Sequence, residues 1–181
     1  MKRKEISVWT YADTILNELS KGVLLTTQAD NKVNTMTISW GSLGIEWGCP
    51  IFTTFVREGR FTREQLEKNG QFTVNIPYGT FQKKILGFCG SRSGRDTDKI
   101  KEMGLTLVPG ETIPVPAIKE LPLTLECEVI YHQLQNLDAI RNRQLVDQCY
   151  PQDVPSNFTG SNKDAHIAFC GRILKAYILE E

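Results

Sequence analysis

The chain has little histidine and lacks the motifs that mark the common hydrolytic and nucleotide-binding sites. Its 181 residues include two histidines, His132 and His166. The sequence has no G-x-G-x-x-G after an expected strand, no P-loop, no H-E-x-x-H and no G-x-S-x-G. A catalytic triad or a histidine-rich metal site would have to be built almost without histidine, so we expect neither.

Long hydrophobic runs and an excess of one charge are also missing. No uncharged apolar run approaches the roughly 18–20 residues of a membrane span, and the charged start Met1–Glu5 does not lead into an apolar signal core. Lys and Arg total 21, and so do Asp and Glu. This balance argues against a nucleic-acid protein held by phosphate contacts. We expect a cytoplasmic protein without a membrane or nucleic-acid partner.

The cysteines are odd in number and form no C-x-x-C pair. Five are spread along the chain, which disfavours both a disulfide framework and a zinc site. Cys127 and Cys170 lie in apolar stretches, and we expect them to be small core residues. With 40% hydrophobic and 23% charged residues, the composition supports a packed core and one domain over 1–181.

Hydrophobic periodicity predicts short strands with a few helices between them. In the first half we expect a helix over about 11–20 capped by Thr10, a helix from the capping box at Thr62 to Gly70, and strands over 23–29, 33–40, 50–57 and 72–76. The last of these alternates with polar residues and is predicted to be half-buried.

The second half is less regular. We expect a helix from Thr80 to about Cys89, a short helix ending at Gly104, an extended connection over 109–122, a strand over 123–131 and a closing strand over 167–179 with a bend at Gly171. Residues 133–164 are polar and are interpreted as a variable segment with a strand near Gln144–Val146. This irregular order favours a mainly antiparallel barrel over a doubly wound parallel sheet.

Three segments rich in hydrogen-bond donors carry the candidate chemistry. In Asn34–Trp40, alternation places Thr35, Thr37 and Ser39 on one face, which fits either a polar ligand or a half-exposed strand. Two arginines flank an expected helix start in Arg57–Thr62, which fits a phosphate site or a simple cap. The loop Gly90–Lys99 fits close approach to a ligand or a helix entry capped by Asp96.

An aromatic residue lies near each of these segments: Trp40, Phe61 and Phe88. Phosphate donors combined with aromatic or apolar surface are typical of sites for phosphorylated planar cofactors. Three such segments in one small domain favour the ligand interpretation over coincidence.

The ordered set of motifs resembles the flavin reductase-like family of FMN-binding split barrels. The resemblance is carried by Asn34–Trp40, by Pro50–Thr62 with Phe72–Pro77, by Gly90–Ile100 with Gly104-Leu105, and by His166–Gly171. It covers roughly residues 20–180 and departs over 133–164. It implies a six-stranded antiparallel Greek-key split β-barrel with short flanking helices, a homodimer and non-covalent FMN.

The resemblance also implies where the flavin binds, with every site residue being a cofactor contact and none a catalytic acid, base or metal ligand. The ring and ribityl chain would be bordered by Asn34, Thr35, Met36, Thr37, Ser39 and Trp40, and the phosphate end by Arg57, Arg60, Thr62 and Lys99. The covering loop would contain Ser91, Ser93, Gly94 and Arg95, and the last strand would contribute His166 and Phe169. His132 fits this set less well, because it follows a long strand and can simply cap its end.

The implied function is an oxidoreductase that passes electrons from NAD(P)H through FMN to a flavin or a redox protein. Since the flavin supplies the redox chemistry, the protein needs no acid–base pair of its own. Two alternatives remain open: a non-enzymatic, flavoredoxin-like electron carrier, and a flavin-free binding barrel.

Overall fold

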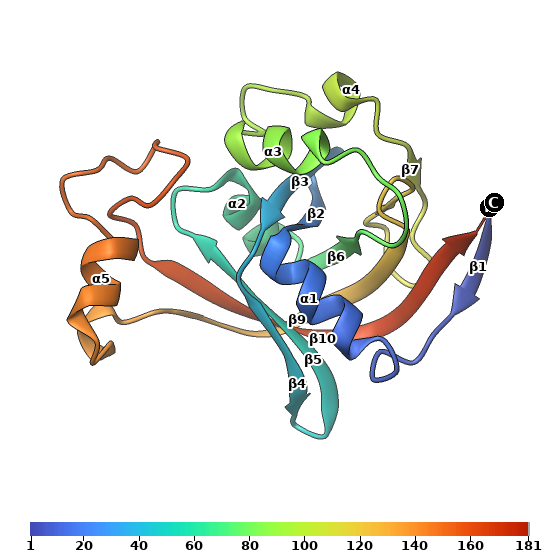
Figure 1. Cartoon of the computed structure of the whole chain (residues 1–181), viewed down its shortest axis with the longest axis horizontal. Helices are drawn as coiled ribbons and strands as arrows, with labels where there is room; N and C mark the ends of the chain where they lie inside the picture. Colours follow the sequence, from blue (N-terminus) through green and yellow to red (C-terminus); the bar gives the residue numbers. More distant parts are fainter. Residues whose placement is uncertain (181) are drawn as a thin grey trace.

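The computed structural model describes residues 1–180, and its main architecture is a curved antiparallel sheet (Figure 1). The strands are β1 (Lys2–Glu5), β2 (Val23–Ala29), β3 (Lys32–Ile38), β4 (Gly41–Glu46), β5 (Cys49–Arg57), β6 (Gln71–Ile76), β7 (Leu107–Val108), β8 (Ala117–Ile118), β9 (Leu123–Leu134) and β10 (His166–Glu180). The helices are α1 (Ala12–Lys21), α2 (Phe61–Lys68), α3 (Lys84–Ser91), α4 (Lys99–Met103), α5 (Arg143–Cys149) and a 3₁₀ turn, η1 (Leu137–Ala139).

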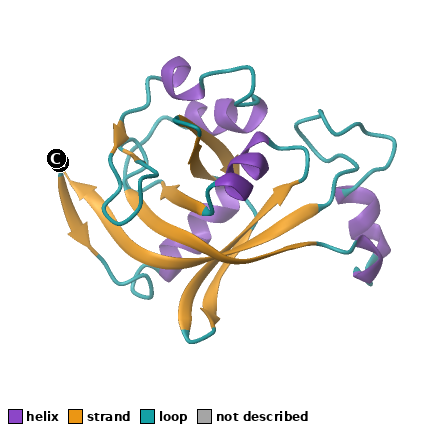
Figure 2. Cartoon of the chain, turned by 180° about the vertical axis from the view of Figure 1, so that it is seen from behind, coloured by secondary structure: helices purple, strands orange, loops and turns teal. Residues whose placement is uncertain are grey.

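The sheet order is β3-β2-β6-β9-β10-β5-β4, with β1 paired to β10. Every pairing is antiparallel, so the predicted mainly β, split-barrel class is confirmed. The main sheet has eight strands rather than the six expected, because β4 and the short β1 were missed. The long strands β9 and β10 cross the molecule and carry α5 at the end far from β1 (Figures 1 and 2).

The core lies on both faces of the central strands. In β6, Phe72, Val74 and Ile76 join the main apolar cluster, and Thr73 and Asn75 are fully buried on the opposite face. The Asn75 amide donates to Thr26 Oγ1 at 2.9 Å and accepts from the Ile118 N–H at 2.8 Å. The prediction that this strand is half-buried is therefore wrong, because the segment containing β8 covers its polar face and satisfies its polar groups.

The bend expected at Gly171 is confirmed as a register shift between Cys170 and Gly171 in the β9–β10 pairing. A Cβ at Gly171 would lie 2.4 Å from the Phe72 ring. Glycine is thus required because a core aromatic ring packs directly on the backbone there.

Several local predictions are wrong. Residues 143–149 form α5 rather than a strand, because the Asn142 side chain accepts the Leu145 N–H and caps a helix. Neither Thr10 nor Thr62 caps a helix, since α1 and α2 start after Tyr11 and Arg60 without side-chain caps. Helix α3 begins at Lys84 rather than Thr80, and the cap of α4 is Asp98 rather than Asp96.

Candidate functional site

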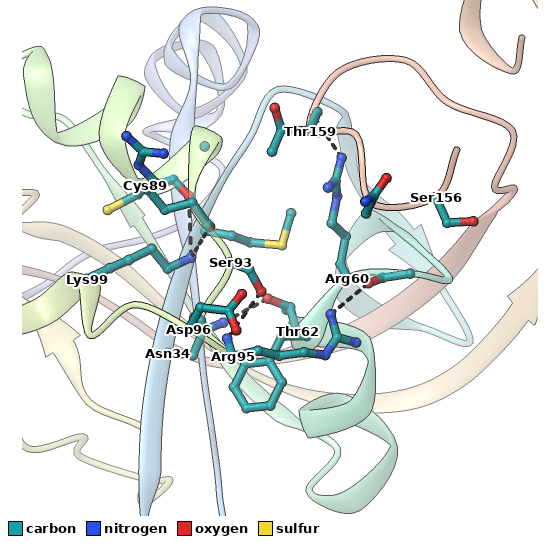
Figure 3. Close-up of a pocket in the computed structure, with 17 residues that line it drawn as sticks. Asn34, Arg60, Thr62, Cys89, Ser93, Arg95, Asp96, Lys99, Ser156 and Thr159 are labelled. Carbon is teal, nitrogen blue, oxygen red and sulfur yellow. Dashed lines mark hydrogen bonds between the residues drawn. The ribbon is translucent and has the colours of Figure 1, made fainter. Parts of the chain in front are cut away.

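Two adjoining cavities lie where β3, the start of α2, the loop before α4 and the segment before β10 come together, and Figure 3 shows the residues that line the first of them. The first has a volume of about 310 Å³ and the second about 230 Å³. Met36, Arg60 and Thr159 line both, so the cavities share a wall and form one elongated site. The first is lined by the cationic side chains of Arg60, Arg92, Arg95 and Lys99, and the second is bordered by Trp40, Phe55 and His166.

Strand β3 places alternate side chains in different surroundings. Asn34 and Met36 line the first cavity. Thr35 is fully buried, accepts from Thr26 Oγ1 at 3.1 Å and lines neither cavity. Thr37 and Ser39 border the second cavity, where Thr37 Oγ1 donates to the Leu86 carbonyl at 2.6 Å. The hydroxyls of Thr35 and Thr37, which were predicted to face a polar ligand, are therefore hydrogen-bonded within the protein.

Lys99 is a buried cation without an acidic partner. The side chain is 4% exposed, and its Nζ reaches only the Cys89 and Arg92 carbonyl oxygens, at 3.4 and 3.3 Å (Figure 3). No salt bridge between residues 1 and 180 includes it. Burial lowers the Lys99 pKa to about 8, with the charge of Arg60 acting in the same direction. An uncompensated buried ammonium is costly, and a bound anion would relieve that cost.

Arg60 contributes the second cation of the first cavity. Its Nη2 donates to the Thr159 carbonyl at 2.7 Å, which leaves the other guanidinium N–H groups available (Figure 3). Burial, and then the charge of Arg57, lower the Arg60 pKa from its usual value. Lys99 and Arg60 thus concentrate positive charge in one cavity.

Asn34 and Gly94 form a close contact at the floor of the first cavity. The Asn34 amide donates to Thr62 Oγ1 at 2.9 Å, and its buried Oδ1 has no hydrogen-bond partner among residues 1–180. A Cβ at Gly94 would lie 2.0 Å from that oxygen. Only glycine fits here, so the loop backbone can approach β3 and the cavity closely.

The loop over the first cavity is fixed by Arg95. Its guanidinium donates to the Gly59 carbonyl at 3.0 Å and pairs with Glu64 on α2. The Arg95 N–H donates to Ser93 Oγ at 3.2 Å. Ser93, Gly94 and Arg95 line the cavity as predicted, whereas Ser91 donates to the Phe88 carbonyl and does not line it. Arg95 therefore mainly connects the loop to α2.

Arg57 lines only the second cavity, and its donors are used by the protein. Its guanidinium donates to the carbonyls of Cys149 at 2.8 Å, Asn162 at 3.3 Å and Asp164 at 2.6 Å. The residue is 7% exposed, and burial lowers its pKa. Arg57, predicted at the phosphate end, instead ties down both ends of the segment 149–164.

That segment supplies site residues that sequence reasoning missed. Ser156, Asn157 and Thr159 line the first cavity, although they come from the region interpreted as variable. Asp164 holds the turn by accepting the Gly59 N–H at 3.1 Å and the Ser156 hydroxyl. No motif marks these residues, because long-range contacts of Arg57, Arg60 and Asp164 bring them to the site. Arg92 and Asp96, within the predicted loop, also line it.

His166 and Trp40 border the second cavity, with ring centroids 4.8 Å apart. His166 is 7% exposed, and its Nδ1 lies 3.0 Å from the Tyr150 hydroxyl. Burial, then the charges of Arg57 and Arg60, lower the His166 pKa to about 3. The imidazole is therefore neutral near pH 7 and unsuited to donate a proton as an acid.

Phe169 is not brought to the site. It is 1% exposed, belongs to the main core and stacks on His132 at 5.6 Å. Within residues 1–180 no three His, Cys, Asp or Glu side chains cluster as a metal site would require. No helix in the same part of the chain is long and apolar enough to cross a membrane.

Comparison with known proteins gives a family match over most of the chain. A family model described as a flavin reductase like domain matches residues 17–180. Among curated proteins, YddH of Escherichia coli is 32% identical over 123 residues, which cover 66% of this chain and 64% of YddH. Three curated relatives are matched over 55–64% of their own length.

Solved structures show the same fold. Flavoredoxin from Methanosarcina acetivorans is 28% identical with a TM-score of 0.62, covering 88% of this chain and 68% of that one. An FMN-binding domain of a flavin reductase-like enzyme from Shewanella baltica is 17% identical, with a TM-score of 0.66 and coverage of 98% and 77%. The second likeness is one of fold alone.

Proposed function

Because the chain belongs to the flavin reductase-like domain family, we propose that it binds FMN and passes electrons from NAD(P)H through it to a flavin or protein acceptor. The family resemblance inferred from the motifs is confirmed. FMN as this chain's own cofactor, the nicotinamide donor and the acceptor are parts of the proposal.

The observation that carries the proposal is the buried Lys99 ammonium beside Arg60. A phosphate dianion would neutralise both cations and accept hydrogen bonds from their unused N–H groups. Such charge-assisted hydrogen bonds are stronger than those between neutral groups. Thr62 and the start of α2 line the same cavity, and a helix N-terminus favours an anion. The residues present therefore fit the phosphate end of the cofactor.

The second cavity fits the planar end. Trp40 and Met36 offer an aromatic and a soft apolar contact, and Thr37, Ser39 and His166 offer polar atoms at the edge. When bound, FMN would supply the hydride and electron transfer chemistry itself. The protein's residues would bind, orient and desolvate it, which matches a site whose histidine is neutral.

The absorption spectrum of the purified full chain, recorded without oxygen before and after NADH and NADPH, tests this function. We expect a flavin spectrum, native or after adding FMN, that bleaches with a reduced nicotinamide. Retained FMN that neither nicotinamide reduces would identify an electron carrier. A colourless protein that ignores added FMN would identify a flavin-free barrel.

We propose FMN rather than FAD as the resident flavin. Lys99 and Arg60 suffice for one terminal phosphate, and the sequence has no Rossmann-type fingerprint for an adenine dinucleotide. Chromatography of the flavin released by denaturation decides this, and a majority of FAD would contradict it.

We also propose a homodimer. Exposed apolar side chains gather on the β4–β5 hairpin and on β9: Ile45 is 72% exposed and Trp47 56%, and the Trp47 ring lies 6.0 Å from Tyr131. Such surface is typical of subunit contacts, and two-fold pairing is their commonest form. Light scattering at micromolar concentration should give twice the mass of one chain, and the mass of a single chain would refute the dimer.

A further inference from the structure

We propose that Tyr150 is a positioning residue which, together with Gln135, fixes the tautomer of His166. In this arrangement the imidazole proton sits on Nδ1, and the bare Nε2 faces the second cavity as a hydrogen-bond acceptor. The site would then select a ligand edge that presents an N–H group. The identity of that ligand rests on the proposed function, for which the imide N–H of the flavin ring is the matching group.

The Tyr150 hydroxyl has two partners and one proton to give. Its oxygen lies 3.2 Å from Gln135 Oε1 and 3.0 Å from His166 Nδ1. An amide oxygen can only accept, so the hydroxyl proton points to Gln135. The contact with His166 must then run the other way, with the Nδ1–H donating to the phenol oxygen.

The charge state of both rings supports this direction. Burial and two neighbouring guanidinium groups keep His166 neutral by lowering its pKa to about 3. A neutral imidazole carries one N–H, so a proton on Nδ1 leaves Nε2 bare. Burial raises the Tyr150 pKa, so the phenol stays protonated and can donate its hydrogen bond to Gln135.

The free edge of His166 lies at the cavity wall. Nε2 makes no hydrogen bond with residues 1–180, and it does not belong to the fully buried polar atoms that lack a partner. This agrees with the position of the ring in the wall of the second cavity. Arg57 holds the other side of the assembly, with its guanidinium 5.1 Å from the centre of the Tyr150 ring. Arg57 therefore packs on the Tyr150 ring beside the histidine, and the Gln135 N–H donates to the His166 carbonyl at 2.9 Å.

The cavity gives this acceptor a distinct role. Arg60 and Ser39 also line it, and the guanidinium of the first and the hydroxyl of the second can both donate. A bare imidazole nitrogen is the complementary group that a ligand donor needs. Since Gln135 and Tyr150 both come from residues 133–164, the variable segment sets the polarity of a residue on β10.

Nitrogen NMR of the full chain, labelled in its histidine side chains and freed of flavin, tests the tautomer. Only two histidines contribute, and a His132→Gln variant assigns them. We expect His166 to show a protonated Nδ1 and an unprotonated Nε2, unchanged from pH 5 to pH 8. A protonated Nε2 in the wild-type chain would overturn the proposal.

Two variants test the control by Tyr150 and Gln135. In Gln135→Leu the hydroxyl loses its acceptor and turns to Nδ1, so His166 should switch to the Nε2–H tautomer. In Tyr150→Phe the ring packing remains but Nδ1 has no acceptor, so both tautomers should appear. The matched control is Tyr131→Phe, which removes an exposed hydroxyl that bonds to Gln133 instead and should change nothing. An unchanged His166 signal in either test variant would overturn the positioning role.

Adding FMN, and FMN methylated at its imide nitrogen, tests the ligand. FMN should shift the Nε2 resonance, and the methylated compound should bind about three- to tenfold more weakly to the wild-type chain, because one neutral hydrogen bond is lost. Gln135→Leu should largely remove this preference. Equal binding of the two flavins to the wild type would overturn the acceptor role. If neither flavin binds, FMN is refuted as the ligand and the tautomer result stands alone.

Discussion

The two cavities contain buried cations that are used in opposite ways. Arg57 gives its donors to three backbone carbonyls and so is satisfied by the protein. Lys99 is as deeply buried but reaches only two carbonyls, at the outer limit of hydrogen bonding. Burial of a charge alone therefore does not mark a ligand site; unsatisfied donors do. The difference separates Arg57, whose contacts are structural, from Lys99, which we propose binds the phosphate of the ligand.

Replacing Arg57 should give the largest effect, and the effect should be on folding. Arg57→Met leaves three carbonyls without their charged donor, and we expect a loss of about 3 kcal/mol in the free energy of unfolding. Urea denaturation of the flavin-free chain measures it. Arg172→Met is the control, because it breaks an exposed pair with Glu128 worth less than about 1 kcal/mol. Equal stability of the two variants would contradict the structural role of Arg57, and with it the difference drawn between Arg57 and Lys99.

Replacing Lys99 or Arg60 by Ala should act on binding more than on folding. Loss of a charge-assisted bond to phosphate costs about 1.5–3 kcal/mol, or roughly ten- to a hundredfold in the dissociation constant of FMN. Fluorescence titration gives the constants. Lys68→Ala, which breaks an exposed pair with Asp30, is the matched control. Unchanged affinity in both test variants would mean that the phosphate end lies elsewhere.

The affinity for FMN should fall as the pH rises through about 8, the Lys99 pKa. The flavin-free protein loses the Lys99 proton in this range, whereas a bound phosphate would hold it, so binding must take up a proton. A single site predicts a decrease of about five- to tenfold between pH 7.5 and 9. Titrations across this range should show the slope in the wild type and not in Lys99→Met. A flat profile in the wild type would contradict the role of Lys99.

The smallest effect is expected at His166. Because its pKa of about 3 keeps it neutral, His166→Ala should change flavin affinity or reduction rate by less than about tenfold, well short of the 10²–10⁴-fold loss typical of a general acid or base. Anaerobic stopped-flow reduction by NADH measures it. Complete loss of reduction with FMN still bound would show that the histidine is catalytic.

The sequence predicted the antiparallel barrel well, because most strands have a local pattern of apolar and polar residues that is typical of strands. Val23–Ala29 was placed at its observed bounds, and the bend at Gly171 was found from a single glycine in an apolar strand. Lys99, Arg60, Gly94 and His166 lie at the cavities as expected, since their motifs sit at element ends. FMN contacts by these residues stay a prediction.

What failed depends on distant partners. The alternation of apolar and polar residues in β6 is typical of a half-buried strand. Its polar side is nevertheless buried, because Pro116 and Ile118, more than forty positions away, cover it. Helix α5 gives little local signal, because it has seven residues, buries only Val146 among them and starts from a single cap residue, Asn142. Phe169 lies three positions from His166, so alternation along β10 turns it to the opposite face, where it joins the core. Ser156 and Thr159 reach the cavity through long-range contacts made by Arg57, Arg60 and Asp164, and no local pattern encodes those contacts.

The clamp that Arg57 places on residues 149–164 has a kinetic consequence. Because it holds the segment at Cys149, Asn162 and Asp164, the entropy of closing this loop is lost during folding and not during binding. A ligand would meet a wall already in place, and its entry should not wait for the segment to order. Its escape, however, should depend on how often the clamp opens. Residence time, more than speed of capture, is then the property that changes in this segment would tune.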